Sequence, residues 1–376
     1  MTGLYLHIPF CHSKCSYCDF YSLTGDEARI AEYVALLTDE LEQKAASWQG
    51  PFDSVFFGGG TPSRLTAAQV AQLLDTVRTR FGLSDNAEVT LEANPGTVTD
   101  ASLNGYRAAG INRLSFGIQT FSDPQLKALG RAHSATQANA AFRAARRAGF
   151  ENLSCDLIFA LPDQGRAELD HDLDALLELA PEHLSAYGLT LEEDTPLFQQ
   201  HQHRALPLPG DEEYAELYLQ LDRRLVAAGY RHYEISNYAR PGYECRHNQE
   251  VWRRRPYLGV GAGAHSFLAT GWGERRCVPP DLEQYRTACE TGHDPSQRLE
   301  TFDRQAAMSE AVYLALRTAE GVVDSAFLTL FGLPFEKAFP EAIAHCEPYL
   351  CHPSGRWHFT PQGWLLYDHL IQHFLL

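Results

Sequence analysis

Short β-like segments alternate with longer amphipathic segments along the first half of this chain, and this alternation constrains the fold more than any other feature. We predict strands over residues 3–9, 53–57, 88–93, 113–117, 152–160 and 183–189. We predict helices over residues 26–48, 66–80, 99–109, 123–129 and 136–148, and a further helix that ends at residue 179. Parallel strands need a crossover between them, and that crossover is usually a helix. The sequence therefore predicts an α/β fold, an open partial (β/α)6 barrel.

The chemically notable residues all follow or end these predicted strands. A cysteine-rich loop follows the first strand and a glycine run follows the second. Glu92 ends the third strand, Gln119 follows the fourth, and Asp156 lies in the fifth. Because functional groups of such barrels collect at the C-terminal ends of the strands, we expect these residues to share one site.

Cys11, Cys15 and Cys18 form a C-x3-C-x2-C run directly after the first predicted strand. Iron–sulfur clusters are held by such thiolates. Asp19 and Phe20 follow, so no nearby fourth cysteine completes a 4Fe–4S cluster, and one iron would stay open to a ligand. A structural zinc site is an alternative, although it usually wants four ligands in two separated pairs. A disulfide framework is disfavoured because the chain is long and its nine cysteines are odd in number.

Further residues suggest a ligand beside this loop. The run 58–62, Gly-Gly-Gly-Thr-Pro, is either a plain tight turn or a place where the backbone approaches a ligand closely. Glu92 and Asp156 are carboxylates in β-like runs, and an inward carboxylate needs a partner, although Glu92 could also face solvent. Arg131 could meet a carboxylate with its planar fork, or be a surface arginine. Cys155 is best explained as a small buried hydrophobe.

Composition excludes some partners. The chain has 376 residues, 44% of them hydrophobic, and carries 48 acidic against 31 basic residues, for a net charge of −17. The negative electrostatic potential that follows from this net charge repels nucleic acid and anionic membranes. No apolar run approaches the roughly 20 residues of a membrane span, and no signal peptide is recognisable at the start. We expect a cytoplasmic protein, because reduced thiols persist there.

The last part of the chain has a different pattern. Amphipathic helices are predicted over residues 303–317, 325–331 and 336–345, followed by strands over 349–351 and 357–359 around a turn at 353–355. Helices followed by a hairpin indicate an α+β winged-helix-like domain. It lacks the basic helix that DNA binding needs, so we interpret it as a lid or partner-docking domain. We therefore predict a barrel over residues 1–230, a connecting segment over 231–300 and a winged-helix-like domain over 301–376.

The spacing of the three cysteines resembles that of radical S-adenosylmethionine (SAM) proteins. Together with the runs 5–11, 58–62, 117–121 and 156–162, it resembles the oxygen-independent coproporphyrinogen III oxidase branch of that superfamily over essentially the whole chain. The resemblance implies a 4Fe–4S cluster on Cys11, Cys15 and Cys18. It also implies that SAM is bound by Tyr5, Tyr17, Gly59, Gly60, Thr61, Glu92, Gln119, Arg131 and Asp156.

Two groups within this branch must be separated, the true oxidases and the HemW-type haem chaperones. The oxidases typically have an N-terminal extension and a further cysteine two positions after the third. Here ten residues precede Cys11, and Phe20 stands at the position of that cysteine. The resemblance therefore favours the chaperones, whose cargo is haem and whose partners are apo-haemoproteins. An oxidase in haem biosynthesis, or a radical SAM enzyme with another substrate, remains the alternative.

Residues 245–252 support the same choice. HemW-type proteins carry an H-N-x-x-Y/W stretch tied to haem binding, which His247 and Asn248 match at its start, whereas Val251 departs from it. A neutral imidazole is a good axial ligand for haem iron, although a lone histidine is more often a plain polar residue. His247 is our candidate haem ligand, with Cys245 and His265 as lesser candidates. A homodimer and peripheral contact with membrane haemoproteins stay open.

Overall fold

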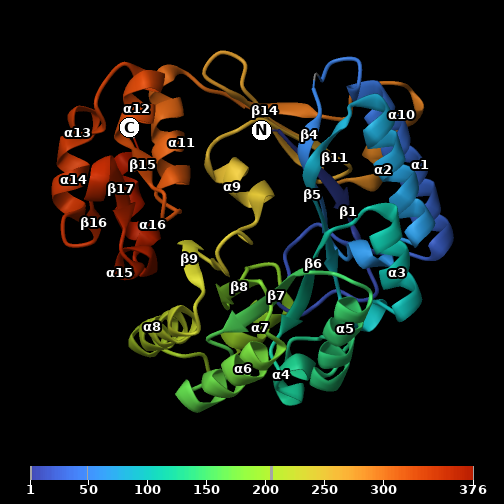
Figure 1. The fold of residues 1–376 in the computed structure, drawn as a ribbon, viewed down its shortest axis with the longest axis horizontal. Coiled ribbons are helices and arrows are strands. Elements are labelled where there is room, and N and C mark those ends of the chain that lie inside the picture. Colours follow the sequence, from blue (N-terminus) through green and yellow to red (C-terminus); the bar gives the residue numbers. More distant parts are fainter. Residues whose placement is uncertain (1, 49, 204–205, 376) are drawn as a thin grey trace.

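The structure is a computed structural model that describes residues 2–48, 50–203 and 206–375. Within these residues one 12-stranded sheet dominates, in the order β14-β13-β12-β11-β1-β4-β5-β6-β7-β8-β10-β9. The sheet curves into an open barrel, and helices cover its outer side (Figure 1). The predicted α/β fold built on a partial barrel is confirmed.

The central strands of the sheet run parallel to one another. They are β11 (Tyr257–Val260), β1 (Gly3–Ile8), β4 (Phe52–Gly59), β5 (Leu83–Ala93), β6 (Arg113–Gln119), β7 (Asn152–Phe159) and β8 (His183–Gly188). All six strands predicted from the sequence are among them. The parallel strand that the sequence did not predict is β11, which pairs with β1 from the far end of the chain.

The crossovers are helical, as parallel pairing requires. They contain α1 (Glu27–Lys44), η1 (Pro62–Arg64), α2 (Ala67–Arg80), η2 (Pro95–Thr97), α3 (Asp100–Ala109), α4 (Asp123–Ala128), α5 (Ala135–Arg147) and α6 (Arg166–Leu179), and α7 (Pro196–Gln202) and α8 (Asp211–Ala227) follow β8. Local sequence starts several of them: Thr66 and Thr99 cap α2 and α3 in reciprocal capping boxes. In α1, Ile30, Val34 and Leu37 are buried at helical spacing, which turns one face of the helix to the core.

Residues 231–300 form both edges of the sheet. On one side are β9 (Arg231–Glu234) and β10 (Asn237–Ala239), and on the other β12 (His265–Leu268), β13 (Glu274–Cys277) and β14 (Gln297–Thr301), with α9 (Arg246–Trp252) and α10 (Leu282–Glu290) between strands. These edge strands are antiparallel. The sequence did not predict them, because segments of three to five residues are too short to show a clear period.

The C-terminal part has an apolar core of its own, rich in phenylalanine, such as Phe327, Phe335 and Phe374. Its elements are α11 (Arg304–Ala315), β15 (Val322–Val323), α12 (Asp324–Phe331), α13 (Phe335–Ala338), α14 (Pro340–Cys346), β16 (Leu350–Cys351), η3 (Pro353–Gly355), β17 (Arg356–Phe359), α15 (Pro361–Leu365), α16 (Tyr367–Leu370) and η4 (Ile371–Phe374). The order β15-β17-β16 makes a small antiparallel sheet against these helices. The predicted α+β winged-helix-like character is confirmed.

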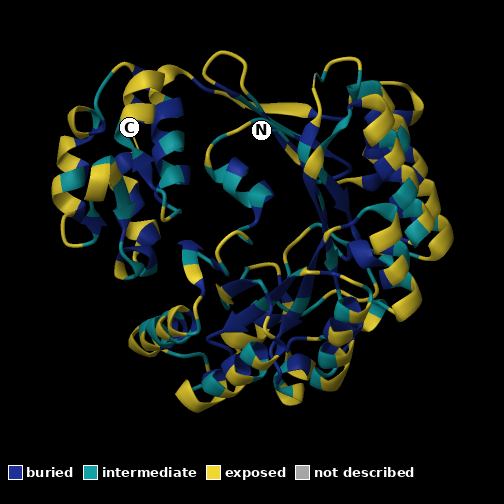
Figure 2. Cartoon of the chain, viewed as in Figure 1, coloured by how far each residue is buried: buried dark blue, intermediate teal, exposed yellow. Residues whose placement is uncertain are grey.

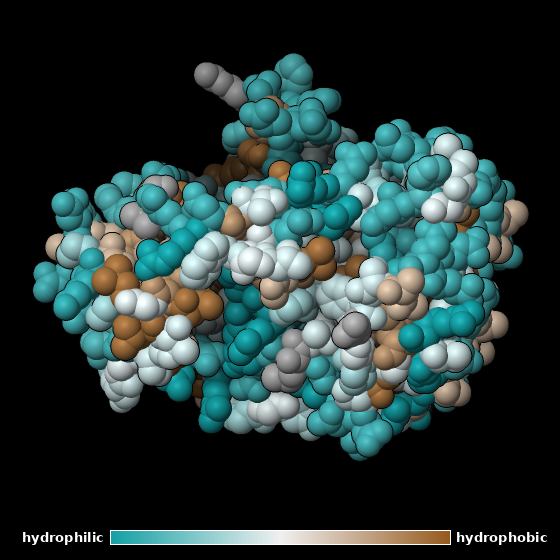
Figure 3. Space-filling model, turned by 90° about the horizontal axis from the view of Figure 1, so that it is seen from above, coloured by the Kyte–Doolittle hydropathy of each residue, from teal (hydrophilic) through white to brown (hydrophobic). Residues whose placement is uncertain are grey.

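Burial follows this architecture. The barrel strands are mostly buried, whereas the outer helices alternate buried and exposed positions (Figure 2). Seen from above, the surface is largely hydrophilic, and hydrophobic patches gather on the side of the C-terminal part (Figure 3). Among the residues described, no helix combines the length and the apolarity that a membrane crossing needs.

Candidate functional site

The cysteine loop lies at the C-terminal ends of the barrel strands, where the sequence predicted it. It leaves β1 through β2 (Phe10–Cys11), and β3 (Leu23–Thr24) pairs with β2 in parallel, so both ends of the loop are fixed. Gly60 lies against its start: a Cβ atom there would stand 3.0 Å from the Phe10 nitrogen and 3.1 Å from Cys11 Sγ. A residue with a side chain would therefore displace the loop.

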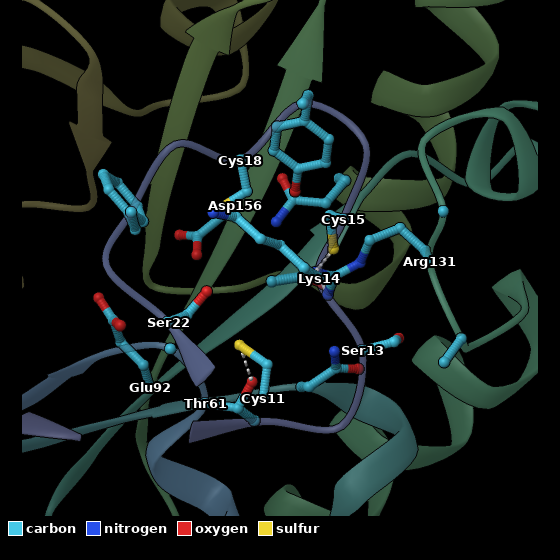
Figure 4. A pocket seen from close by; sticks show the side chains of 18 of the residues that line it. Cys11, Ser13, Lys14, Cys15, Cys18, Ser22, Thr61, Glu92, Arg131 and Asp156 are labelled. Carbon is cyan, nitrogen blue, oxygen red and sulfur yellow. Dashed lines mark hydrogen bonds between the residues drawn. The ribbon is translucent and has the colours of Figure 1, made fainter. Parts of the chain in front are cut away.

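The three predicted cluster ligands are partly exposed thiols that line one cavity. Thr61 Oγ1 donates a hydrogen bond to Cys11 Sγ at 3.5 Å, and Arg131 Nη1 donates to Cys15 Sγ at 3.5 Å (Figure 4). In the described part of the chain, no three His, Cys, Asp or Glu side chains are arranged to hold a single metal ion. A 4Fe–4S cluster places different demands, because each thiolate binds a separate iron. Three thiols, two of which accept a hydrogen bond from a neighbouring side chain, fit the ligand set of such a cluster.

The cavity beside the cysteines, called the cluster cavity below, has a volume of about 710 Å³. It brings together eight of the nine residues that the resemblance assigned to SAM: Tyr17, Gly59, Gly60, Thr61, Glu92, Gln119, Arg131 and Asp156. The ninth, Tyr5, does not line it. The structure thus gathers residues from four strands, β4 to β7, and from three loops around one space next to the thiols.

The cluster cavity offers groups of opposite charge. Burial, together with the Asp156 carboxylate, raises the pKa of Glu92 to about 8, although the Gly59 N–H group opposes this. Burial also raises the pKa of Asp156, which accepts a hydrogen bond from Ser115 Oγ at 3.2 Å. Arg131 Nη2 donates to the Gly117 carbonyl at 2.6 Å, but its Nε is buried without a partner among the described residues. A zwitterion such as the methionine end of SAM fits, with its ammonium near the carboxylates and its carboxylate near Arg131.

Two backbone features shape this cavity. Gln119 has a φ of 72°, a left-handed conformation that is uncommon for residues other than glycine, and the β6–β7 register shifts at this point. Strain of this kind often marks a ligand site. Gly59 has a φ of 113°, and a Cβ atom on it would lie 2.8 Å from the His7 ring.

A second cavity of about 520 Å³, called the lumen cavity below, fills the inside of the barrel. It shares Phe20, Gly59, Glu92, Ser115, Asp156 and Tyr187 with the lining of the cluster cavity, so the two are adjacent. Its walls include the aromatic residues Tyr5, Phe56, Trp252 and Tyr257, the histidines His7, His183, His247 and His265, and Arg113. Inward positions of a packed (β/α)8 barrel carry mostly Val, Ile and Leu. The polar, hollow interior found here indicates a ligand site.

His247, the predicted haem ligand, lies in α9 and lines the lumen cavity. Its side chain is buried, its Nδ1 lies 2.9 Å from Ser54 Oγ, and its ring centroid is 5.2 Å from that of Phe56. Burial, assisted by Arg113, lowers the pKa of His247 to about 4, so the ring is neutral at pH 7. Its Nε2 has no hydrogen-bond partner among the described residues, so Nε2 can bind a metal in the tautomer in which Nδ1–H donates to Ser54 Oγ.

The lesser candidates differ in position. His265 also lines the lumen cavity. Cys245 lines neither cavity: it is fully buried, and its thiol donates to Glu88 Oε1 at 3.6 Å. Burial, with the nearby Glu88 carboxylate, raises the pKa of Cys245 to about 12. The structure therefore does not bring Cys245 together with the other candidates.

Sequence reasoning missed several residues of the lumen cavity, among them Arg113, Ser115 and Tyr187. The signal was present in β6, where Arg113 and Ser115 stand two apart and therefore share one face of the strand. The sequence does not show that the barrel is hollow, so it could not be predicted that this face points inward and lines a cavity.

Fold and site together define a class, that of radical SAM proteins: an open barrel with a three-cysteine loop above an acidic cavity. The sequence profile of the radical SAM superfamily matches residues 5–176, and that of the HemN C-terminal domain matches residues 302–366.

Relatives define the family more closely. The chain is 38% identical to the heme chaperone HemW of Escherichia coli (strain K12), covering 99% of this chain and 98% of that protein. It is 35% identical to heme chaperone HemW of Bacillus subtilis (strain 168), covering 100% and 99%, and 39% identical to that of Mycobacterium tuberculosis (strain H37Rv), covering 99% and 94%. The chain belongs to the HemW family. Among solved structures, the coproporphyrinogen III oxidase HemN of Escherichia coli shares the fold, with a TM-score of 0.86, 24% identity, and coverage of 100% of this chain and 90% of that one.

Proposed function

We propose that this protein is a haem chaperone of the radical SAM type, which binds a 4Fe–4S cluster, SAM and haem and delivers haem to apo-haemoproteins. The observation that carries the proposal is the polar lumen cavity beside the cluster cavity, with a neutral His247 whose Nε2 is free. The HemW relatives, which are named heme chaperones, support the same conclusion.

In this proposal the residues of the cluster cavity hold the two cofactors. Cys11, Cys15 and Cys18 bind the cluster, and Arg131 hydrogen-bonds Cys15 Sγ while offering its unpaired Nε to a ligand carboxylate. Glu92, whose raised pKa of about 8 favours its protonated form near pH 7, would release that proton to solvent and pair as a carboxylate with the ligand ammonium. A 4Fe–4S cluster with SAM supplies one-electron chemistry when bound. The residues of the chain bind and orient these cofactors and exclude water from the cavity.

The lumen cavity takes haem. The rings of Tyr5 and Phe56 lie 6.2 Å apart in a stacked arrangement and offer a flat apolar surface to a macrocycle. His247 would supply a nitrogen to the haem iron through Nε2, in the tautomer in which Nδ1–H donates to Ser54 Oγ.

The remaining parts follow from this role. We assign residues 1–230 to the barrel, 231–300 to a connecting segment whose strands complete the sheet, and 301–376 to the C-terminal domain, because the C-terminal part has a separate apolar core. We place the protein in the cytoplasm, where its nine thiols stay reduced. Exposed Leu328 and Leu330 of α12 make the C-terminal domain our candidate for contact with the haem acceptor.

The test is anaerobic reconstitution with iron and sulfide, followed by haem titration in the Soret band and a parallel assay for carbon dioxide released from coproporphyrinogen III. We expect stoichiometric haem binding without decarboxylation. His247→Ala should lose the Soret shift, whereas His265→Ala, a control from the same cavity, should keep it. Decarboxylation with little haem binding would instead identify a coproporphyrinogen oxidase, the alternative function.

A further inference from the structure

Arg113 is the first residue of β6, and its side chain lines the lumen cavity. Only 2% of it is exposed, which makes it the largest fully buried side chain of the described residues. A buried arginine at this place is unusual, because a guanidinium that leaves water needs both a counter-charge and hydrogen-bond acceptors.

The acceptors are missing. Within residues 2–48, 50–203 and 206–375, Arg113 makes no side-chain hydrogen bond and no ion pair within 4.0 Å, and its Nε is buried without a partner. Thr90 stands directly beside it in the β5–β6 ladder, and the Thr90 hydroxyl is also buried without a partner. Two unsatisfied polar groups therefore lie at the same level of the barrel. Unmade hydrogen bonds of buried groups are costly, and a ligand acceptor would remove that cost.

The counter-charge is present but occupied. Glu88 is buried and lies near Arg113, yet its oxygens already accept from the backbone N–H groups of Arg246 at 3.2 Å and His247 at 3.1 Å, and from the Cys245 thiol. Although burial opposes it, the neighbouring Cys245 and Glu88 raise the pKa of Arg113, so it stays charged. The positive charge of Arg113 is thus balanced by the nearby Glu88 carboxylate, whereas its N–H groups lack hydrogen-bond acceptors.

We propose that Arg113 anchors a carboxylate of the ligand in the lumen cavity, and that this carboxylate is a propionate of a tetrapyrrole. The inference rests on the proposed function and names the group that orients the cargo. A planar guanidinium fork suits a carboxylate, and the aromatic walls of the same cavity suit a flat ring.

Two observations favour a tetrapyrrole over SAM as the owner of this carboxylate. The cluster cavity already has its own arginine, Arg131, with an unpaired Nε for the SAM carboxylate. Arg113 lines only the lumen cavity, together with His247. In a chain with a net charge of −17, a dianionic ligand also needs a local cation to enter. Arg113 fixes the propionate edge of the ligand, and His247 binds its metal.

The experiment compares two ligands on the full, anaerobically reconstituted chain: haem and haem dimethyl ester, in which both propionates are blocked. The unchanged protein should bind haem roughly tenfold or more tightly than the ester, since hydrogen bonds to charged groups have about this strength. Arg113→Met should abolish this preference by weakening haem and leaving the ester unchanged. Arg147→Met, a control at an exposed arginine on α5, should keep the preference.

The possible results are distinguishable. If the unchanged protein binds no haem, the proposed function fails and the anchor with it. If it binds haem and ester equally, or if Arg113→Met keeps the preference, the anchor alone is refuted. If Arg113→Met loses affinity for SAM and keeps the haem preference, Arg113 serves SAM instead. Should the Met variant not fold, Arg113→Lys keeps the charge without the fork and should show a reduced preference, and the ligand comparison on the unchanged protein still decides.

Discussion

Glu40 gives a quantitative test of the barrel electrostatics. It lies in α1 with 0% exposure. Its Oε2 accepts from Tyr285 Oη at 2.8 Å and from the Gly261 nitrogen at 2.9 Å, whereas Oε1 is buried without a partner among the described residues. One carboxyl group therefore joins α1 to α10 and to the turn after β11. Burial raises its pKa from 4.5 to about 7.

The sign of the pH effect follows from this direction. Because the folded-state pKa lies above the unfolded one, the protonated group favours folding. That stability is fully present below pH 4.5 and is lost as the pH rises through about 7. At about 1.4 kcal/mol for each pKa unit, the loss amounts to about 3 kcal/mol.

The perturbation is Glu40→Gln, which keeps an oxygen for both donors and cannot ionise. The stability of the variant relative to the unchanged protein should rise by about 3 kcal/mol between pH 4.5 and pH 8. Urea unfolding at a series of pH values measures this difference. Glu42→Gln is the matched control, because Glu42 lies on the same helix, is half-exposed and pairs with Arg80. Parallel pH profiles for Glu40→Gln and the unchanged protein would refute the reasoning.

Three further predictions concern the site and the C-terminal domain. Cys15→Ser should abolish the 4Fe–4S absorption after reconstitution, whereas Cys351→Ser, in β16, should keep it; an intact cluster in the first variant contradicts the ligand assignment. SAM affinity, measured by calorimetry, should rise roughly tenfold for each pH unit as the pH approaches the Glu92 pKa of about 8 from below, because Glu92 binds the ammonium as a carboxylate. Glu92→Gln should remove this pH dependence of the affinity. Arg317 lies over the rings of Trp252, at 5.0 Å, and of two tyrosines, so Arg317→Met should lower stability by about 1–2 kcal/mol in chemical unfolding, and an unchanged value would exclude a cation–π contribution.

Local sequence was enough for the central strands and for the cluster loop. The strands at Phe52–Gly59 and Asn152–Phe159 are long, and each is followed by a helical pattern, which for the first begins at the Thr66 cap, so their parallel pairing could be predicted. The cysteine spacing and the glycine run are also local patterns. They indicated the cluster cavity because parallel strands place their C-terminal ends at one edge.

The lumen cavity depends on contacts that local patterns do not contain. Tyr5 was assigned to SAM by resemblance, but its side chain points into the barrel and its hydroxyl lies 3.0 Å from His7 Nδ1. No local sequence pattern distinguishes Arg113 from other strand residues, because its position matters only in a barrel with a hollow interior. β11 is stabilised by pairing with β1, which lies more than a hundred residues away in the sequence, and the edge strands are too short to show a clear period, which is why sequence periodicity did not reveal them.

The late position of β11 and α9 in the chain sets an order of events during synthesis. The strands from β1 to β8 and the cysteine loop leave the ribosome first, whereas His247 and the strand that pairs with β1 follow later. At about 5–20 residues per second, the roughly 70 residues between β8 and β11 take several seconds. The nascent chain thus has its cysteine loop before it has the last strand and helix that line the lumen cavity. In the proposed function, capture of haem therefore has to wait until the chain has been made beyond residue 260.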